Sequence, residues 1–324
     1  METFRTIVNC SVSSEKIGYE TPILMLGSCF TESLSARMKQ FKFNVVVNPF
    51  GIVYHPVPAA VQLDRIITGK IYKAKELQKY NDLWISFDHH GRFTHPDVSI
   101  CLKQINDELQ KAHEQLTRSD WLFITFGTAW AYRLRNKRRI VANCHKYPAQ
   151  YFERIRLDDD RIYAIWSRVI TRLWRINPAI KIVFTISPIR HLNEGAHENQ
   201  LSKSILLLAV DRLVHQLENT GYFPAYELVL DDLRDYRFYA EDMKHPNDLA
   251  VSYIWQHFCE SYMTDCTLKT MKTVEDIVKA AAHKPIHKSL EYRKFADNYL
   301  KKIFNLKQQY PQFDFSKEIE RFES

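Results

Sequence analysis

The feature that most constrains the fold is a series of short, largely apolar runs that end at small or polar residues. Four of them are residues 23–26 (ILML), 43–47 (FNVVV), 121–126 (WLFITF) and 181–186 (KIVFTI), and residues 223–230 form a fifth candidate. Runs of this length are typical of strands that are buried on both faces of a parallel sheet.

Segments with helical periodicity separate these runs. After the first run, Phe30, Leu34 and Met38 recur at four-residue spacing, which indicates a helix that begins near Ser28. The other expected helices cover residues 56–67, 99–116, 161–175, 201–219 and 247–261. We also expect two hairpins, 84–87 with 92–94 and 131–135 with 138–142. Alternating strands and helices predict an α/β three-layer sandwich with a mostly parallel central sheet, as in flavodoxin-like folds.

The charge distribution suggests a division of the chain into an α/β domain (residues 1–262) and a charged C-terminal extension (residues 263–324), helical to about Leu306. Residues 267–324 hold 12 basic and 8 acidic residues, so they supply +4 of the net charge of +7. We interpret this tail as a solvated helical face and do not expect a nucleic-acid partner. Salt-dependent retention on DNA or RNA would favour the alternative.

Composition narrows the class of protein further. The chain is 45% hydrophobic and 26% charged, as in ordinary globular proteins. Its six cysteines form no CxxC pair, which argues against a zinc site and favours reduced thiols. The N-terminus lacks the apolar segment of a signal peptide, and no apolar run reaches the length of a membrane span. These features predict a cytoplasmic protein that needs no membrane, metal or cofactor.

Small and polar residues follow the strands, at the sheet edge where α/β proteins bind ligands. Gly27, Ser28 and Cys29 form a strand-to-helix turn. A nucleophile there lies beside free backbone N–H groups and the positive end of a helix dipole. A second candidate is Asp242 with His245, because a carboxylate three residues before a histidine can orient the imidazole as a base.

Three other polar clusters have simpler interpretations. Asp88, His89, His90 and His95 lack a defined metal-ligand spacing, so we expect a turn and a partly exposed strand there. The Ser-Lys pair at 202–203 is expected to open a helix, with Ser202 as a routine N-cap and Lys203 or Arg190 available to an anionic group. The basic residues between 133 and 139 are expected to form a solvated sheet edge.

Together these motifs resemble the SGNH (GDSL-like) hydrolases, and within them a bacterial group, the GSCFA family. The family's name matches residues 27–30 (GSCF), with Thr31 in place of the final Ala. Further matching stretches are residues 48–51 (NPFG), 126–129 (FGTA), 143–146 (NCHK), 187–191 (SPIRH) and 236–239 (YRFY), which leads into Asp242 and His245. The resemblance covers about residues 1–260.

The resemblance implies a site but also shows departures from the superfamily pattern. In the Gly-Asp-Ser turn of these enzymes the third residue is the nucleophile, so Cys29 takes that position and Ser28 takes the place of Asp. The Gly-x-Asn-Asp block matches residues 127–130, where Ala129 replaces the oxyanion-hole Asn. Asn48, Thr128 or Asn143 could supply the missing donor.

The expected activity is therefore hydrolysis or transfer of an acyl ester through a covalent intermediate, with an acylated sugar or a similar small ester as substrate. Cys29, with Ser28 as the alternative, attacks the carbonyl, His245 moves the proton and Asp242 orients His245. We expect the thiol to ionise readily beside an imidazole and a helix N-terminus. The backbone N–H groups of Cys29 and Gly51 are expected to bind the oxyanion. Other expected oxyanion or substrate contacts are Asn48, Gly127, Thr128, Asn143, His145 and Arg190. The alternative function is a non-catalytic binding module that retains the pocket.

Overall fold

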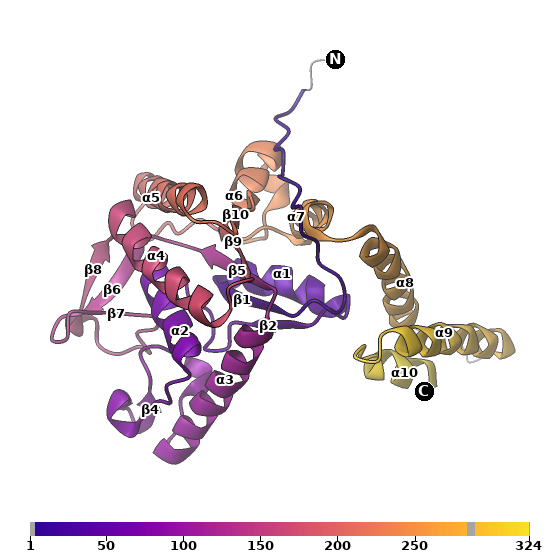
Figure 1. Cartoon of the computed structure of the whole chain (residues 1–324), viewed down its shortest axis with the longest axis horizontal. Coiled ribbons are helices and arrows are strands. Elements are labelled where there is room, and N and C mark those ends of the chain that lie inside the picture. The colour runs from indigo at the N-terminus through magenta and orange to yellow at the C-terminus, as the bar shows by residue number, and fades with distance from the viewer. Residues whose placement is uncertain (1–3, 284–288, 324) are drawn as a thin grey trace.

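Four of the apolar runs become neighbouring strands of one parallel sheet in the computed structural model, which describes residues 4–283 and 289–323 (Figure 1). In this described part, the sheet has five strands in the order β10-β9-β5-β1-β2. The strands are β1 (Ile23–Gly27), β2 (Val45–Val47), β5 (Trp121–Phe126), β9 (Lys181–Ile186) and β10 (Thr220–Tyr222). The order reverses between β1 and β5, and parallel sheets bind ligands at the carboxyl ends of the strands at such a reversal.

Helices cover both faces of this sheet, which confirms the predicted α/β fold class (Figure 1). Leu24 and Leu122 point to the face that α2, α3, α4 and α5 cover, and Ile23 and Phe123 point to the face of α1 and α7. Leu24 is paired with Leu122 across β1 and β5, so the alternation of the strands separates the two cores. The helices are α1 (Cys29–Gln40), α2 (Pro56–Thr68), α3 (Val98–Arg118), α4 (Asp159–Ile176), α5 (Ala196–Gln216) and α7 (Asp248–Tyr262).

The fifth strand lies earlier in the chain than the sequence pattern suggested. β10 occupies Thr220–Tyr222, and the predicted strand segment instead becomes α6 (Ala225–Glu227) and a π-helical turn (Leu228–Leu233). Ala225, Leu228 and Val229 are buried at helical spacing. The prediction of a strand over 223–230 was therefore wrong, because an apolar run without clear alternation fits a buried helical turn equally well.

One of the two predicted hairpins is confirmed, and the other is present only as a single bridge. β6 (Trp130–Leu134) pairs antiparallel with β7 (Arg139–Val141), as expected. Trp84 forms an antiparallel bridge with His95, but the main partner of β4 (Leu83–Ile85) is the preceding β3 (Gln78–Tyr80). Asn81 and Asp82 both adopt positive φ between them, which is the turn geometry that a two-residue hairpin requires.

A third strand changes the interpretation of the basic hairpin. β8 (Phe152–Arg156) pairs with β6, so β6 is the central strand of a small antiparallel sheet rather than an exposed edge. Arg133 Nε lies 2.5 Å from Glu153 Oε1 on β8. The hairpin is therefore not simply a solvated edge, because its charges are partly neutralised by neighbouring acids.

The C-terminal extension contributes to the core and is not merely a solvated face. It forms α8 (Asp265–Ala282), α9 (Leu290–Gln309) and α10 (Ser316–Glu323), which lie to one side of the sheet (Figure 1). Phe313 and Phe315 are fully buried and join the apolar cluster of the α1 and α7 face. The extension was expected to be helical to about Leu306. It is helical in α8 and in α9, which ends at Gln309, and residues 284–288 lie outside the described range. No helix among the described residues combines the length and apolarity needed to cross a bilayer.

Candidate active site

The site begins at the turn between β1 and α1, where the backbone geometry requires glycine. Gly27 has φ +142°, and a Cβ at this position would lie 2.3 Å from the carbonyl oxygen of Thr125 on β5. A side chain therefore cannot fit without moving the central strand. This turn leads directly into α1 and places Cys29 at the first position of the helix.

Asn48 holds this turn from the end of β2. Its Oδ1 accepts from the Gly27 N–H at 2.8 Å, and its Nδ2 donates to Glu32 Oε1 at 2.6 Å. The residue is buried and has φ +42°. Both ends of the Asn48 amide are engaged, so its side chain is not available as the missing oxyanion donor and instead fixes the turn.

The two candidate nucleophiles face different surroundings. The Ser28 side chain is fully buried, and its hydroxyl has no hydrogen-bond partner among the described residues. Cys29 is half-buried and lines a cavity. The turn thus directs the thiol, rather than the hydroxyl, toward solvent-accessible space.

Asp242 and His245 lie in a short loop that folds back on itself before α7. Asp242 Oδ1 accepts from the backbone N–H groups of Lys244 and His245 at 2.9 and 3.0 Å. Its Oδ2 lies 2.5 Å from His245 Nδ1. The two backbone N–H groups, and then the imidazole, hold the pKa of Asp242 well below its usual range. The carboxylate is therefore ionised at neutral pH and fixes the imidazole with Nε2 pointing away from it.

The imidazole connects this loop to the turn after β1. His245 Nε2 lies 3.6 Å from Cys29 Sγ, which is within the range of a hydrogen bond to sulfur. Residues far apart in sequence thus form a continuous Cys–His–Asp array. His245 and Asp242 are exposed at the rim, with 48% and 47% of their side-chain surfaces accessible.

The thiol does not ionise as readily as the sequence suggested. Burial raises the pKa of Cys29 above its ordinary value, and this effect exceeds several contributions that lower it. The lowering contributions come from its own N–H group, the Tyr54 hydroxyl, the Phe30 N–H group and the positive charge of Lys203. The helix N-terminus lowers the pKa of the thiol as expected, but desolvation in the cavity wall raises it by more. Cys29 is therefore a neutral thiol at neutral pH.

An open cavity of about 510 Å³ lies in front of Cys29. Its wall combines aromatic rings, amides and cations from the ends of β1, β5 and β9, from β6 and from the His245 loop. The polar and aromatic lining residues are Cys29, Tyr54, His55, Thr128, Trp130, Tyr132, Asn143, Cys144, Arg154, Arg190, His191, Asn193, Lys244 and His245.

Three of the residues predicted to contact the oxyanion or the substrate make their hydrogen bonds within the fold. The Gly51 N–H donates to the Asn48 carbonyl at 2.7 Å, and Gly51 does not line the cavity. The N–H groups of Gly127 and Thr128 both donate to the Tyr54 carbonyl, at 2.8 and 3.1 Å. The Thr128 hydroxyl bonds to Ser202 Oγ and to a backbone N–H. These groups hold the cavity wall in place and are not free to bind an oxyanion.

Of the other residues predicted to contact the oxyanion or the substrate, Asn143 and Arg190 line the cavity and His145 does not. The Oδ1 of Asn143 accepts from the His145 N–H, and its Nδ2 has no acceptor in the described chain. His145 Nε2 lies 2.7 Å from the Ser86 carbonyl oxygen. Asn48, Thr128 and Asn143 were the candidates to replace the oxyanion-hole Asn that Ala129 lacks. Among them, Asn143 Nδ2 is the donor without an acceptor in the described chain.

Ser202 and Lys203 lie inside α5 rather than at its start, so Ser202 is not an N-cap. Ser202 Oγ accepts from the Ala129 N–H at 2.8 Å. Lys203 is fully buried, and its Nζ donates to the carbonyls of Gly127 and Ser187 at 2.7 and 2.6 Å. Burial lowers the pKa of Lys203 to about 7. This lysine joins the segments that follow β5 and β9 and is not among the residues that line the cavity.

Several cavity residues were missed in the sequence. Tyr54 follows the Asn-Pro-Phe-Gly segment after β2, and His191 follows Arg190 after β9. Tyr54 lies just beyond a stretch that already stood out, so extending that segment by a few residues would have included it. His191 and Trp130 are the last residues of the matching stretches 187–191 and 127–130, where neither was given a role. Arg154 comes from β8, which no local motif connects with the site.

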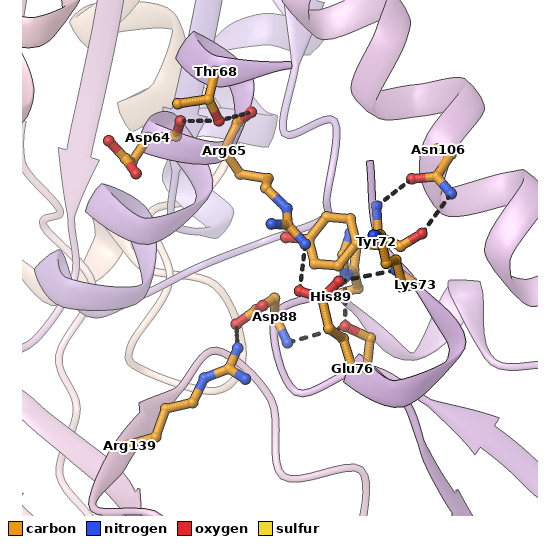
Figure 2. Close-up of polar contacts among 11 residues, drawn as sticks. Asp64, Arg65, Thr68, Tyr72, Lys73, Glu76, Asp88, His89, Asn106 and Arg139 are labelled. Carbon is orange, nitrogen blue, oxygen red and sulfur yellow. Dashed lines mark hydrogen bonds and ion pairs between the residues drawn. The ribbon is translucent and has the colours of Figure 1, made fainter. Parts of the chain in front are cut away.

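The histidines near residue 89 do not form a metal site. Asp88 pairs with Arg139, and the region around Tyr72 and Glu76 is a network of ion pairs and hydrogen bonds (Figure 2). His89 is buried among aromatic rings, with its Nδ1 2.7 Å from Ser86 Oγ. Within the described ranges, no group of three or more His, Cys, Asp or Glu side chains could hold a metal ion.

The fold and the array together define a class of α/β protein with Cys, His and Asp at the switch point of a parallel sheet. The chain belongs to the GSCFA family, whose model matches residues 22–258, so the predicted family is confirmed. A second family model, described as the C-terminal domain of GSCFA domain proteins, matches residues 274–324.

Searches among known proteins add little about function. No curated protein matches. A carbohydrate esterase family 3 protein from Talaromyces cellulolyticus is a structural neighbour at 10% identity and TM-score 0.32, covering 79% of this chain and 99% of its own. A mutant acetyl esterase with a bound acetate ion has 10% identity and TM-score 0.33, with the same coverage. At such low similarity, neither neighbour's activity is carried over to this chain.

Proposed function

We propose that this protein is an SGNH-type esterase or acyltransferase that forms a covalent acyl-cysteine on Cys29. The observation that carries the proposal is the continuous array in which His245 lies 3.6 Å from Cys29 Sγ and 2.5 Å from Asp242. Nucleophile, base and orienting carboxylate at hydrogen-bond distances are the arrangement that nucleophilic acyl transfer requires. The open cavity in front of the thiol gives an ester access to the sulfur.

In the first half of the reaction, Cys29 Sγ attacks the carbonyl carbon of the ester and forms a C–S bond. The thiol proton passes to His245 Nε2 at the same time, because burial keeps the thiol protonated until attack. The tetrahedral intermediate then collapses, the ester C–O bond breaks, and the alcohol leaves with the proton from His245. Asp242 stabilises the imidazolium throughout.

In the second half, water or another alcohol attacks the acyl-cysteine and gives its proton to His245 Nε2. The C–S bond breaks, and the sulfur recovers that proton from His245. The product is a free acid when water attacks, or a new ester when an alcohol attacks. No cofactor takes part in either half.

The negative oxygen of each intermediate needs donors, and two groups in the cavity wall are suited to this role. The N–H of Cys29 lies at the start of α1, where helix N–H groups lack intrahelical partners. Asn143 lines the same cavity and its Nδ2 has no acceptor in the described chain, so we assign it the role of the missing Asn. We expect an acylated sugar or a similar small ester as substrate.

The division of the chain into two domains, residues 1–262 and 263–324, is part of the same proposal.

The nucleophile is tested by exposing the protein to p-nitrophenyl acetate and measuring turnover and acetyl adducts by mass spectrometry. Cys29→Ala should abolish the adduct, and Ser28→Ala should retain it at a reduced rate. Cys266→Ala is the matched control, because Cys266 is an exposed thiol far along the chain. An adduct that survives Cys29→Ala and disappears with Ser28→Ala would reassign the nucleophile. Absence of both adduct and turnover in the unaltered protein would favour a non-catalytic binding module.

A further inference from the structure

Three residues that line the cavity carry buried nitrogen atoms without a partner. Trp130 Nε1, Arg190 Nε and His191 Nε2 make no hydrogen bond to any described residue. The first two are obligatory donors. The His191 imidazole is neutral, because burial first and nearby cations second lower its pKa to about 4, so it can donate one N–H. Buried donors without acceptors cost free energy, so this part of the wall is poor in acceptors, although these three atoms themselves have almost no accessible surface.

The charge of the wall has one sign. Among the described residues that line the cavity, Arg154, Arg190 and Lys244 are cationic and none is Asp or Glu. Arg154 is neutralised by Glu194, since its Nη2 and Nε both lie 2.6 Å from Glu194 Oε1. Arg190 and Lys244 have no ion pair with any described acid. The cavity therefore presents two uncompensated positive charges beside the Cys–His–Asp array.

The position of Arg190 close to another cation, Lys203, adds to the positive charge beside the cavity. Arg190 immediately follows Ile189 after β9, and its charge contributes, after burial, to lowering the pKa of the buried Lys203. Two cations placed close together without an intervening carboxylate repel one another. An anion held by Arg190 in the cavity would relieve this repulsion.

We propose that the ester bound in this cavity carries an anionic oxygen group, a carboxylate or a phosphate, which Arg190 binds with help from Lys244. This inference rests on the proposed function for the ester itself, but the anion site stands on the wall of the cavity alone. Arg190 suits this role because its planar guanidinium can donate two parallel hydrogen bonds to one carboxylate or phosphate group.

The first experiment compares two reagents of nearly equal size that alkylate thiols, the anion iodoacetate and the neutral iodoacetamide. The rate ratio of iodoacetate to iodoacetamide is measured at Cys29 by mass spectrometry, with the exposed Cys266 as the reference thiol in the same molecule. We expect the ratio at Cys29 to exceed that at Cys266 by about tenfold, the effect of one charge-assisted contact. Arg190→Gln should bring the two ratios together.

Arg212→Gln is the matched control. Arg212 lies on α5 outside the cavity and pairs with Asp160, so its removal should leave the ratio at Cys29 unchanged. Equal ratios at Cys29 and Cys266 in the unaltered protein would overturn the inference. So would an elevated ratio that persists in Arg190→Gln.

A second experiment needs no reactive thiol and identifies the anion. Melting temperatures are compared in monomethyl succinate, methyl phosphate and neutral dimethyl succinate at matched ionic strength, because a ligand that binds only the folded state stabilises it. We expect one of the two anions to raise the melting temperature of the unaltered protein and of Arg212→Gln, but not of Arg190→Gln. The effective anion distinguishes a carboxylated from a phosphorylated ester. If neither anion stabilises the protein, the inference fails. If one does while Cys29 forms no acyl adduct, the anion site stands and the proposed function fails.

Discussion

The side-chain oxygen of Asn48 accepts a hydrogen bond from the backbone N–H of Gly27 at 2.8 Å, so the end of β2 fixes the turn that carries Cys29. The Asn48 backbone N–H also donates to the carbonyl of Met25 on β1, at 2.9 Å. The position of the candidate nucleophile therefore depends on a residue that does not line the cavity. Asn48 acts through the turn, as a positioning residue.

Asn48→Ala should destabilise the protein by about 1–3 kcal/mol, because the buried N–H of Gly27 loses its acceptor. Chemical denaturation measures this change. The same variant should lower the alkylation rate of Cys29 by iodoacetamide relative to Cys266 under native conditions. Asn305→Ala, on the exposed surface of α9, is the control and should change neither quantity. Unchanged stability of Asn48→Ala would remove Asn48 from this positioning role.

Asp242→Asn should leave the loop folded, because the amide oxygen can still accept from the N–H groups of Lys244 and His245. Its NH₂ group would donate to His245 Nδ1 and leave the proton on Nε2, so the imidazole could no longer accept from Cys29. We expect turnover of an activated ester to fall by roughly 10⁴. Asp235→Asn is the matched control, since Asp235 also accepts from a backbone N–H two residues on. Steady-state kinetics of the two variants decides the point, and equal turnover in both would exclude Asp242 from the mechanism.

Lys203 makes the stability of the protein depend on pH in a defined window. Burial lowers its pKa from 10.5 to about 7, so between these values the unfolded chain binds a proton that the folded chain does not. The free energy of unfolding should therefore rise with pH from about 7 to 10.5 as the cost of burying the charge disappears. Urea denaturation of the protein and of Lys203→Met at a series of pH values isolates this contribution. A constant difference between the two proteins across the window would contradict it.

The C-terminal extension should matter to stability more than to the site. Phe315 is fully buried, and the Lys42 ammonium lies 4.9 Å from its ring centre. Phe315→Ala should cost about 3–5 kcal/mol of unfolding free energy, the usual range for a large core aromatic. Phe304→Ala, on the exposed side of α9, should change it by less than about 0.5 kcal/mol.

The same two variants test whether the extension acts on the chemistry. The alkylation rate of Cys29 in the folded protein should match in Phe315→Ala, Phe304→Ala and the unaltered chain, because no described residue beyond 263 lines the cavity. A folded Phe315→Ala protein with an unreactive Cys29 would show that the extension shapes the site.

The sequence was sufficient for the features that local patterns encode. Continuous apolar runs predicted β1, β5 and β9 nearly to the residue, because a strand buried on both faces tolerates few polar side chains. Helical spacing of Phe30, Leu34 and Met38 predicted α1, and all three side chains are buried. The extent of β10 could not be predicted in this way, because residues 223–230 are apolar without a period that separates strand from helix.

By itself, the sequence determined four of the five strands of the described sheet, the turn at Gly27 and the placement of Asp242 three residues before His245, since each is encoded by residues that are neighbours in the chain. Only the tertiary structure decided which polar groups remain free for a ligand. The N–H of Gly51 and the amide of Asn48 are used within the fold, whereas Asn143 Nδ2 and Arg190 Nε have no hydrogen-bond partner among the described residues. Hydrogen-bond partners, burial and the resulting rise in the pKa of Cys29 come from segments distant in sequence, whose approach no local pattern encodes.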